Sequence, residues 1–429
     1  MAAIIAAALA LTGCGTPSAA PDEAGPAGRV AALSGSATES TPSTDVTPRA
    51  ELGRLKRLDR ARNRAAHQAA EAEDLRQAAE AAASRARVRK KRAHQDRART
   101  AAATNPLAGR TWGVYQGPRE PTWEPYLRAS GSTKTALGKI ALAPKAVWFG
   151  AWIPDDEIAT KVSQYIAASQ HGDPDALVQM TVFRMVPWEH DACQRRASPA
   201  EQASYRTWID RFAGAIGDTP TAIVLQPDGP FSLCAPGGPA GPAALLAYAT
   251  RALSAHANTS VYIEIGAADW PAAGQGGVDS VLKFLLPAGI EDARGVALNG
   301  THYSDTGLEI ARGTAVVEAL ADRGITDKHF VVNTSGNGNP FEFGHYTGAD
   351  PLNANVCRSV SDPSTCVTLG IPPTTRVAAK AWGLSRQARA DARSYADGYL
   401  WFGRPWLYRQ NYPFQMDRAL GLVRSTPFR

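Results

Sequence analysis

Seven short runs of apolar, β-branched and aromatic residues recur beyond residue 104 of this 429-residue chain, and segments of helical length separate them. The runs occupy residues 146–152, 177–186, 222–228, 260–266, 295–303, 329–336 and 398–405. Strands that alternate strictly with helices form a parallel sheet with right-handed crossovers, and near-continuous apolar strands are buried on both faces. The pattern therefore predicts an α/β fold, either a β/α barrel or a doubly wound sheet.

Helical character is clearest in residues 198–217. Ser198 and Glu201 have the spacing of a capping box there, and four large apolar side chains fall on one face. Four further spacers have the same character and are predicted to be helices, at residues 154–169, 242–257, 308–324 and 375–396.

Two absences favour the barrel over the doubly wound sheet. No G-x-G-x-x-G follows the first strand and no Walker lysine occurs, so a nucleotide-binding sheet has no support. In a barrel, the residues at the C-terminal strand ends converge on one mouth. Polar and aromatic residues occupy those positions here, namely Trp148, Arg184, Asp228, Glu264, Asn299, His302, Asn333, Ser335 and Arg404. Such a mixture of hydrogen-bonding groups and rings is typical of a sugar site.

The first 14 residues have the pattern of a bacterial lipoprotein signal. An apolar run leads through small residues to Cys14, which in such signals becomes the lipidated N-terminus after the upstream segment is removed. A secretory signal with an incidental cysteine is the alternative. Both predict an exported protein, and the lipid predicts attachment to a membrane.

Two further segments precede the predicted barrel domain of residues 104–429. Residues 15–48 are rich in Ser, Thr, Pro, Ala and Gly, which predicts a disordered tether. Residues 49–103 are rich in Ala, Arg, Glu and Gln and predict a basic helical stalk, either a solvated spacer or a contact to anionic lipid or cell-wall polymer. The stalk carries the surplus positive charge of the chain, because residues 49–99 contain 16 Lys and Arg but only 7 Asp and Glu. The net charge of the whole chain is +6. The remainder is slightly acidic, which excludes a nucleic-acid binder.

Export permits disulfides, and four cysteines remain after Cys14: Cys193, Cys234, Cys357 and Cys366. Of three pairings, proximity in the sequence favours Cys357 with Cys366 and leaves Cys193 with Cys234. No C-x-x-C occurs and the histidines are scattered, so we assign no metal and no cofactor.

The strand-end motifs, in chain order, are VLQPDGP, SVYIEIGAADWP, GVALNGTHY, VVNTSGNGNP and YLWFGRP. In type and order they resemble glycoside hydrolase family 6, the cellobiohydrolases and endoglucanases that cut β-1,4-glucan with inversion, over residues 105–425. The resemblance implies a distorted barrel of seven parallel strands with the active site at its C-terminal mouth.

The resemblance also implies roles for individual residues. The general acid of the family falls on Asp228, which without the resemblance is an ordinary turn residue. A second aspartate of the family falls on Asp191, with Glu189 and His190 as alternatives. The aspartate that the family has in a third motif is replaced here by Glu264. The sugar-stacking positions fall on Trp148 and Trp270, although both rings could instead form barrel wall. The two disulfides of the family correspond to the pairings favoured above, and Asn299, His302, Asn333 and Arg404 complete the predicted substrate-binding set.

The chain departs from the pattern of the family after the last strand. Gly403 stands where a lysine is expected, and Leu407 and Arg409 replace residues of an acidic cluster that includes the aspartate often proposed as the base. Val356 replaces another tryptophan. The base is therefore unassigned. Asp191, Glu189 and Glu264 are candidates for an indirect base, and the alternative is an activity that is weak, redirected to another glucan, or absent.

Three functions are compatible with these features. The first is an exported, lipid-anchored, monomeric glycoside hydrolase acting on β-1,4-glucan or a related polysaccharide, with Asp228 as acid. The second is a carbohydrate-binding protein that has lost catalysis, and the third is an inert surface scaffold.

Overall fold

The computed structural model describes residues 105–346 and 350–428. Its strands are β1 (Val147–Gly150), β2 (Val178–Phe183), β3 (Thr221–Leu225), β4 (Thr259–Glu264), β5 (Gly295–Leu298), β6 (His329–Asn333) and β7 (Ala396–Leu400). Each of the seven predicted runs overlaps one of these strands, so the predicted strands are confirmed.

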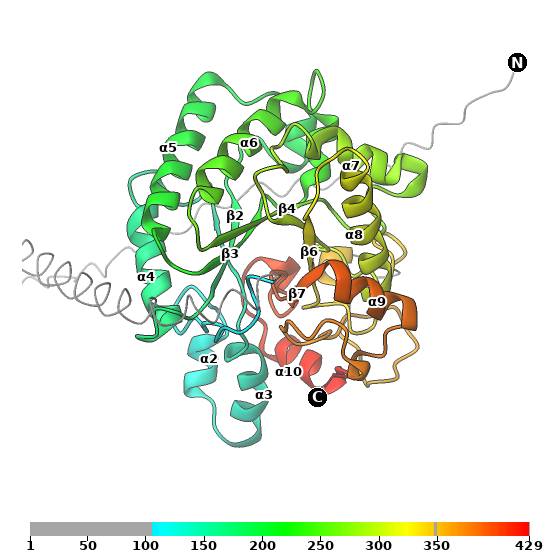
Figure 1. Ribbon diagram of the computed structural model, residues 1–429. Helices are drawn as coiled ribbons and strands as arrows, with labels where there is room; N and C mark the ends of the chain where they lie inside the picture. The colour runs from blue at the N-terminus through cyan, green and yellow to red at the C-terminus, as the bar shows by residue number, and fades with distance from the viewer. Residues whose placement is uncertain (1–104, 347–349, 429) are drawn as a thin grey trace, which may run out of the picture. The chain divides into compact units, whose positions relative to one another are not determined.

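The strands form one parallel sheet in the order of the chain, from β1 to β7 (Figure 1). An order without reversal has no topological switch point, so the doubly wound alternative is excluded. The sheet curls into a barrel that is incompletely closed between β1 and β7. At this gap, which we call the seam, the backbone N–H of Ala146 donates to the carbonyl of Trp401 at 2.9 Å. The predicted distorted seven-stranded barrel is confirmed.

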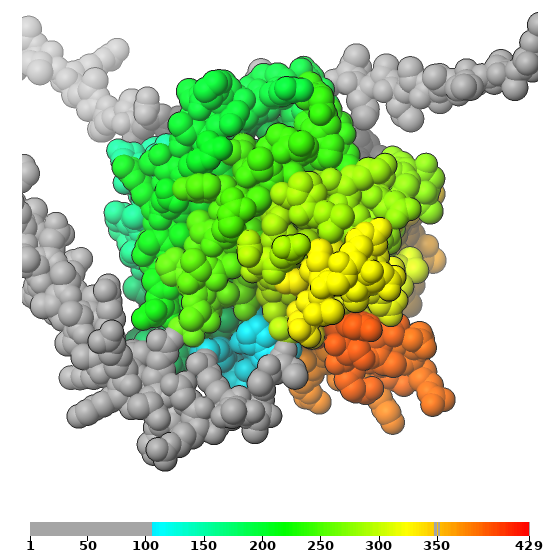
Figure 2. All heavy atoms as spheres, turned by 45° about the horizontal axis from the view of Figure 1, so that its top comes forward, coloured from blue at the N-terminus to red at the C-terminus, as the bar shows by residue number. Residues whose placement is uncertain are grey.

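Helices between consecutive strands form an outer layer around the sheet. They are α4 (Ile158–Gln170), α5 (Pro199–Ile216), α6 (Ala240–Ser254), α7 (Gly277–Leu285), α8 (Thr306–Ala321) and α9 (Arg386–Tyr395). Figure 2 shows one face of this layer, where the green segments that include α5 and α6 pack against the yellow-green segments that include α7. The capping box of Ser198 and Glu201 is present at the start of α5.

The helix predicted over residues 375–396 is wrong for its first half. Only α9 is α-helical there, because Gly383 takes a left-handed conformation with φ 72° and the Ser385 side chain caps a new helix. Lys380–Trp382 form a single 3₁₀ turn, labelled η5. The sequence pattern did not distinguish this turn from a continuous helix.

The two faces of the sheet pack in different ways. Alternate strand residues such as Ile223, Ile263 and Val332 face outward into one large apolar core under the helices. Residues between them, such as Val224 and Tyr262, form a smaller inner cluster. The inner face therefore holds both apolar packing and polar side chains.

A third apolar cluster lies beneath the two ends of the described chain. It joins α3 (Gly131–Ala141), which follows α2 (Trp123–Arg128), to α10 (Met416–Ser425) through Leu137, Ile140, Ala419 and Leu422. Figure 1 shows α2, α3 and α10 together on one side of the barrel.

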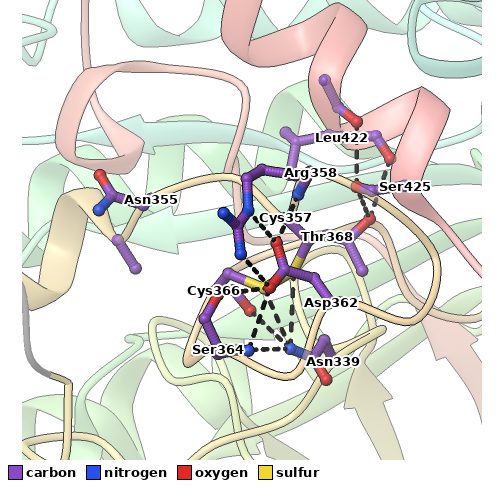
Figure 3. Close-up of a disulfide and its surroundings, with 12 residues drawn as sticks. Asn339, Asn355, Cys357, Arg358, Asp362, Ser364, Cys366, Thr368, Leu422 and Ser425 are labelled. Atoms are coloured by element: carbon purple, nitrogen blue, oxygen red, sulfur yellow. Dashed lines mark hydrogen bonds and ion pairs between the residues drawn. A yellow bond between two sulfur atoms is a disulfide. The ribbon is translucent and has the colours of Figure 1, made fainter.

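Both predicted disulfides are present, Cys193 with Cys234 and Cys357 with Cys366. The second closes a short loop in which the Asp362 carboxylate accepts hydrogen bonds from Arg358 and Ser364 (Figure 3). Asn339 donates to the carbonyl of Ser364 at 3.1 Å from outside the loop. The loop is thus fixed both covalently and by charge-assisted hydrogen bonds.

The predicted signal with Cys14, the tether of residues 15–48 and the stalk of residues 49–103 lie outside the described residues. Among the described helices, none is long and apolar enough to cross a bilayer.

Candidate active site

Backbone strain is concentrated at the C-terminal ends of the strands, which we call the mouth. Eight described residues other than glycine have a positive φ angle. Six of them follow strand ends at the mouth: Glu189, Gln226, Asp228, Asn299, Arg409 and Gln410. Residues with a side chain adopt this left-handed conformation at a cost, and such positions cluster at functional sites. The mouth is therefore the place to look for chemistry.

Asp228 is a shielded carboxyl at this mouth. It follows β3, it is 9% exposed, and its Oδ1 accepts a hydrogen bond from the Thr301 hydroxyl at 2.8 Å. Burial raises the pKa of Asp228, although the hydrogen bond from Thr301 opposes this. The next residue must be glycine, because a Cβ on Gly229 would lie 2.0 Å from the Glu264 carbonyl oxygen. Asp228 thus keeps a proton to higher pH than an exposed aspartate does.

Glu264 lies beneath Asp228 and is 1% exposed. Its carboxylate accepts backbone hydrogen bonds from Gly229, Gly266 and Gly300 at 3.1, 2.9 and 3.3 Å. These donors come from the loops after β3, β4 and β5, so one side chain ties three loops together. Burial, and after it the charge of Asp228, raise the pKa of Glu264 well above its ordinary value. The structure places Glu264 as a support for Asp228 and not at the open surface.

The loop after β2 supplies a second carboxyl near Asp228. It contains the 3₁₀ helix η1 (Glu189–Cys193), and the Cys193–Cys234 disulfide joins η1 to η2 (Gly229–Cys234). Glu189 is an exposed residue, yet partial burial of its carboxyl and then the charge of Asp228 raise its pKa. Asp191 is exposed and its charge acts on Arg195. Glu189, the alternative at this position, is thus the residue whose protonation responds to Asp228.

The loops after β4 and β5 bring aromatic rings and an ion pair together. His302 Nδ1 lies 2.8 Å from Asp269 Oδ1, and the imidazole stacks on Trp270 with centroids 5.5 Å apart and on Phe343 at 4.4 Å. Burial alone would raise the pKa of Asp269, but the hydrogen bond and charge of His302 lower it. One face of Trp270 is therefore covered by a histidine that Asp269 orients.

Asn299 and Asn333 are committed to the backbone. Each side-chain amide donates to the other residue's carbonyl oxygen, at 3.0 and 2.8 Å. The Asn333 Oδ1 also accepts from the backbone N–H groups of Phe402 and Gly403, both at 3.1 Å. Both asparagines are almost fully buried, so they fix the strand ends and offer little surface to a ligand.

Trp148 and Arg404 meet across the seam. The Arg404 guanidinium carbon lies 4.7 Å from the centre of the Trp148 ring, and the indole N–H donates to the Phe402 carbonyl at 2.6 Å. Burial lowers the pKa of Arg404 to about 10, partly offset by the charge of Glu120. The arginine covers a ring face that the sequence assigned to sugar stacking.

Gly403 stands at the position where family 6 has a lysine, and the structure leaves no room for a side chain there. A Cβ there would lie 2.6 Å from Asn333 Nδ2, 2.7 Å from Ser335 Oγ and 3.1 Å from Gln410 Oε1. Gln410 itself donates to the Thr301 carbonyl at 2.9 Å. The space around this position is filled by polar groups of neighbouring loops.

Sequence reasoning missed Thr301, Asp269 and Gln410. Thr301 and Asp269 each lie beside a predicted site residue, in NGTHY and ADWP, so their positions were a signal. Gln410 had no such signal, because it reaches the mouth only through the left-handed backbone of residues 409 and 410. Over residues 105–346 and 350–428, no group of three or more His, Cys, Asp or Glu side chains gathers as a metal site would require.

Comparison with known proteins gives a consistent result. Residues 120–380 match the family described as Glycosyl hydrolases family 6. Endoglucanase A of Cellulomonas fimi is 30% identical over 229 residues, which cover 53% of this chain and 47% of that protein. Endoglucanase 1 of Streptomyces halstedii is 30% identical over 234 residues, 53% of this chain and 70% of that protein. The chain therefore spans about half the length of the first of these two relatives.

Solved structures share the fold. The endoglucanase Cel6 from Mycobacterium tuberculosis, in complex with a methyl-cellobiosyl-4-deoxy-4-thio-β-D-cellobioside, is 26% identical with a TM-score of 0.57 and covers 74% of this chain and 98% of its own. The catalytic core domain of the cellobiohydrolase Cel6A from Chaetomium thermophilum is 17% identical with a TM-score of 0.56, covering 76% of this chain and 99% of its own.

Proposed function

The chain belongs to family 6 of the glycosyl hydrolases, and we propose that it hydrolyses a β-1,4-linked glucan or a related polysaccharide with inversion at the anomeric carbon. The observation that carries this proposal is Asp228, a carboxyl with a raised pKa at the mouth of the barrel. A general acid needs a proton near the working pH, and burial supplies this condition.

Asp228 acts as the general acid. Its proton passes to the glycosidic oxygen as the bond from that oxygen to the anomeric carbon breaks, while water attacks the opposite face and loses its own proton to a base. Thr301 holds the carboxylate that forms, through the hydrogen bond at 2.8 Å. Glu264 positions the acid indirectly, because its three backbone hydrogen bonds fix the loop that begins with Gly229.

Glu189 takes the role of base, directly or through one water. It is exposed, and its raised pKa brings it closer to the value that suits a base near neutral pH. Inverting enzymes place acid and base about 6.5–9.5 Å apart. Replacing Glu189 with Ala should abolish hydrolysis, and azide should restore turnover by giving a glycosyl azide of inverted configuration. Loss of activity that azide does not restore would remove Glu189 from this role.

A carbohydrate-binding protein without catalysis is the second candidate, and one observation favours it. The segment from Trp401 to Gln410 carries no Asp or Glu, so the acidic cluster expected after the last strand is absent. This candidate predicts binding of oligosaccharides without any release of reducing ends.

Product anomers separate the two candidates. The full chain is incubated with a panel of β-glucans and the products are followed by proton NMR. We expect α-anomers to appear first from β-linked substrate, before mutarotation. Absence of turnover on every glucan, with oligosaccharide binding retained, would favour the binding protein.

We further propose that the protein is exported, anchored through Cys14 and monomeric. Two disulfides support export, because such bonds persist in oxidising compartments. Metabolic labelling with a fatty acid, lost on Cys14→Ala, tests the anchor.

A further inference from the structure

Two cations at the seam, the buried Lys145 and the partly buried Arg404, lie near one carboxylate. Glu120 is 5% exposed, accepts hydrogen bonds from Thr122, and lies 3.4 Å from the Lys145 Nζ. The charge of Glu120 also reaches Arg404. Among the described residues, however, nothing pairs with the Arg404 guanidinium, and its Nε is buried without a hydrogen-bond partner. An excess positive charge therefore remains at the seam, on a guanidinium that is partly buried.

The guanidinium is held ready for a ligand. It lies over the Trp148 ring at 4.7 Å, and the indole is itself fixed by its hydrogen bond to Phe402. Arginine presents planar, paired N–H groups that match the two oxygens of a carboxylate. A stacked arginine loses less freedom on binding than a mobile one, so the arrangement favours anion binding.

Further donors beside Trp148 lack partners. Thr181 is opposite Trp148 in the β1–β2 register, and Gln179 lies two residues earlier on the same face of β2. The intervening Met180 packs in the outer core, so both polar side chains face the barrel interior. The Thr181 hydroxyl and both amide atoms of Gln179 are buried without hydrogen bonds. Buried polar groups are rarely left unpaired, so these atoms require partners from outside the protein, either water or a ligand.

A chain of hydrogen bonds links this site to the acid. The Arg404 backbone N–H donates to Gln410 Oε1 at 3.3 Å, and the Gln410 amide donates to the Thr301 carbonyl at 2.9 Å. The Thr301 hydroxyl then donates to Asp228 at 2.8 Å. The loops that carry Arg404 and Asp228 are therefore joined at the same end of the barrel.

We propose that the seam binds the carboxylate of an acidic sugar residue through Arg404, so that the substrate is a β-linked polysaccharide containing uronic acid units. The inference rests on the proposed function, since it names the substrate class of the same site. A neutral glucan would leave Arg404 unpaired, whereas a uronate supplies the missing negative charge.

Binding to an inactive protein tests this without interference from hydrolysis. The full chain carrying Asp228→Asn is titrated by calorimetry with cellotetraose and with β-1,4-linked tetraglucuronate, which differ only at C6. We expect the tetraglucuronate to bind about tenfold more tightly, since a charge pair at a partly buried site is worth roughly that much. Added salt should weaken only the acidic ligand.

Variants of Arg404 assign the effect to one side chain. In the same background, Arg404→Met should remove the preference for the tetraglucuronate and the salt dependence of its binding, while Arg404→Lys keeps part of both. Arg206→Met is the matched control, because Arg206 also stacks on a ring, at 5.6 Å from Tyr248, outside the mouth. If Arg404→Met does not fold, the salt dependence of tetraglucuronate binding to the Asp228→Asn protein, in which Arg404 is unchanged, still tests the proposal.

Failure of this inference differs from failure of the proposed function. Equal binding of the two tetrasaccharides overturns the uronate assignment, while hydrolysis of neutral glucan would still stand. A preference that survives Arg404→Met also overturns it. Binding of neither ligand, together with no hydrolysis of any glucan, overturns both.

Discussion

Each end of the barrel contains a buried carboxylate, but the two carboxylates have different partners. At the N-terminal strand ends, which we call the floor, Asp397 is 1% exposed and accepts hydrogen bonds from the Tyr262 hydroxyl at 2.7 Å and from Arg294 at 2.8 and 2.9 Å. His329 lies 3.5 Å away. At the mouth, Asp228 accepts a hydrogen bond from Thr301 and lies beside a second carboxyl, Glu264. Both carboxyls are buried, so we attribute the role proposed for Asp228 to the difference in their partners.

The contrast extends to the other polar groups. At the mouth, Gln226, Ser335 and Arg404 each have a buried side-chain atom without a partner. A cavity of about 330 Å³ lies near the floor, lined by Asn105, residues 375–379, Arg393 and Ala396, and its lining contains no carboxyl. Three polar side chains at the mouth thus have an atom without a partner, whereas the Asp397 carboxylate at the floor is held by three hydrogen bonds.

The largest expected effect comes from Asp228→Asn. The amide has no proton to give to the leaving oxygen, so kcat on the best glucan should fall about 10²- to 10⁴-fold. Stability should not fall. A carboxyl whose pKa is raised by folding destabilises the fold as pH rises past its unfolded value, and asparagine removes this cost. Reducing-end release measures the activity and thermal unfolding measures the stability. Unchanged activity would contradict the role proposed for Asp228, because this carboxyl would then matter no more for hydrolysis than Asp397 does.

Asp397→Asn should have the converse effect. Removing the carboxylate leaves Arg294 at the floor with a weaker partner, and breaking a buried ion pair typically costs about 3–5 kcal/mol. Urea unfolding should show this loss, while the pH dependence of activity stays as in the unmodified protein. A shift in that dependence would mean that the floor and the mouth are coupled, contrary to the contrast drawn here.

Much of this arrangement was predictable from the sequence, for identifiable reasons. Seven apolar runs, the capping box at Ser198 and the proximity of Cys357 to Cys366 are local signals, and the strands, the start of α5 and both disulfides are confirmed. The family resemblance is confirmed by the match over residues 120–380. Strand-end positions also converge on the mouth, as a parallel barrel requires.

The parts that escaped prediction depend on long-range contacts. Arg404 covers Trp148 only because the sheet curls until β1 and β7 meet, and no local pattern encodes that approach. Glu189 adopts a left-handed conformation with φ 51°, and the charge of Asp228 raises its pKa, neither of which a local pattern in the sequence predicts. Whether Asp191 acts in catalysis, and whether Asn299 and Asn333 contact substrate, remain predictions that the variants of this site can test.

Gly403→Ala tests how tightly the strand ends at the mouth are packed. Its Cβ would approach Asn333 and Ser335 within 2.7 Å, so neighbouring groups must shift, which typically costs about 1–3 kcal/mol. Gly214→Ala in α5 is the control, because nothing lies within 4 Å of its Cβ, and helix propensity should stabilise it by up to about 1 kcal/mol. Thermal unfolding should show a lower melting temperature for Gly403→Ala and a higher one for Gly214→Ala. Equal stability would show that the strand ends at the mouth adapt freely.

The smallest effect we expect is a change in pH dependence when Thr301 becomes Val. The hydroxyl donates to the ionised form of Asp228 and so lowers its pKa, and removing it should raise that pKa further. Asp228 would then stay protonated to higher pH, and the alkaline limb of kcat/KM should move upward by about one pH unit. Thr301→Ser keeps the hydroxyl and should leave the limb in place. A limb that stays fixed in the valine variant would mean that some other group sets the protonation of the acid. The partners of Asp228 would then not explain why this carboxyl, and not Asp397, is the reactive one.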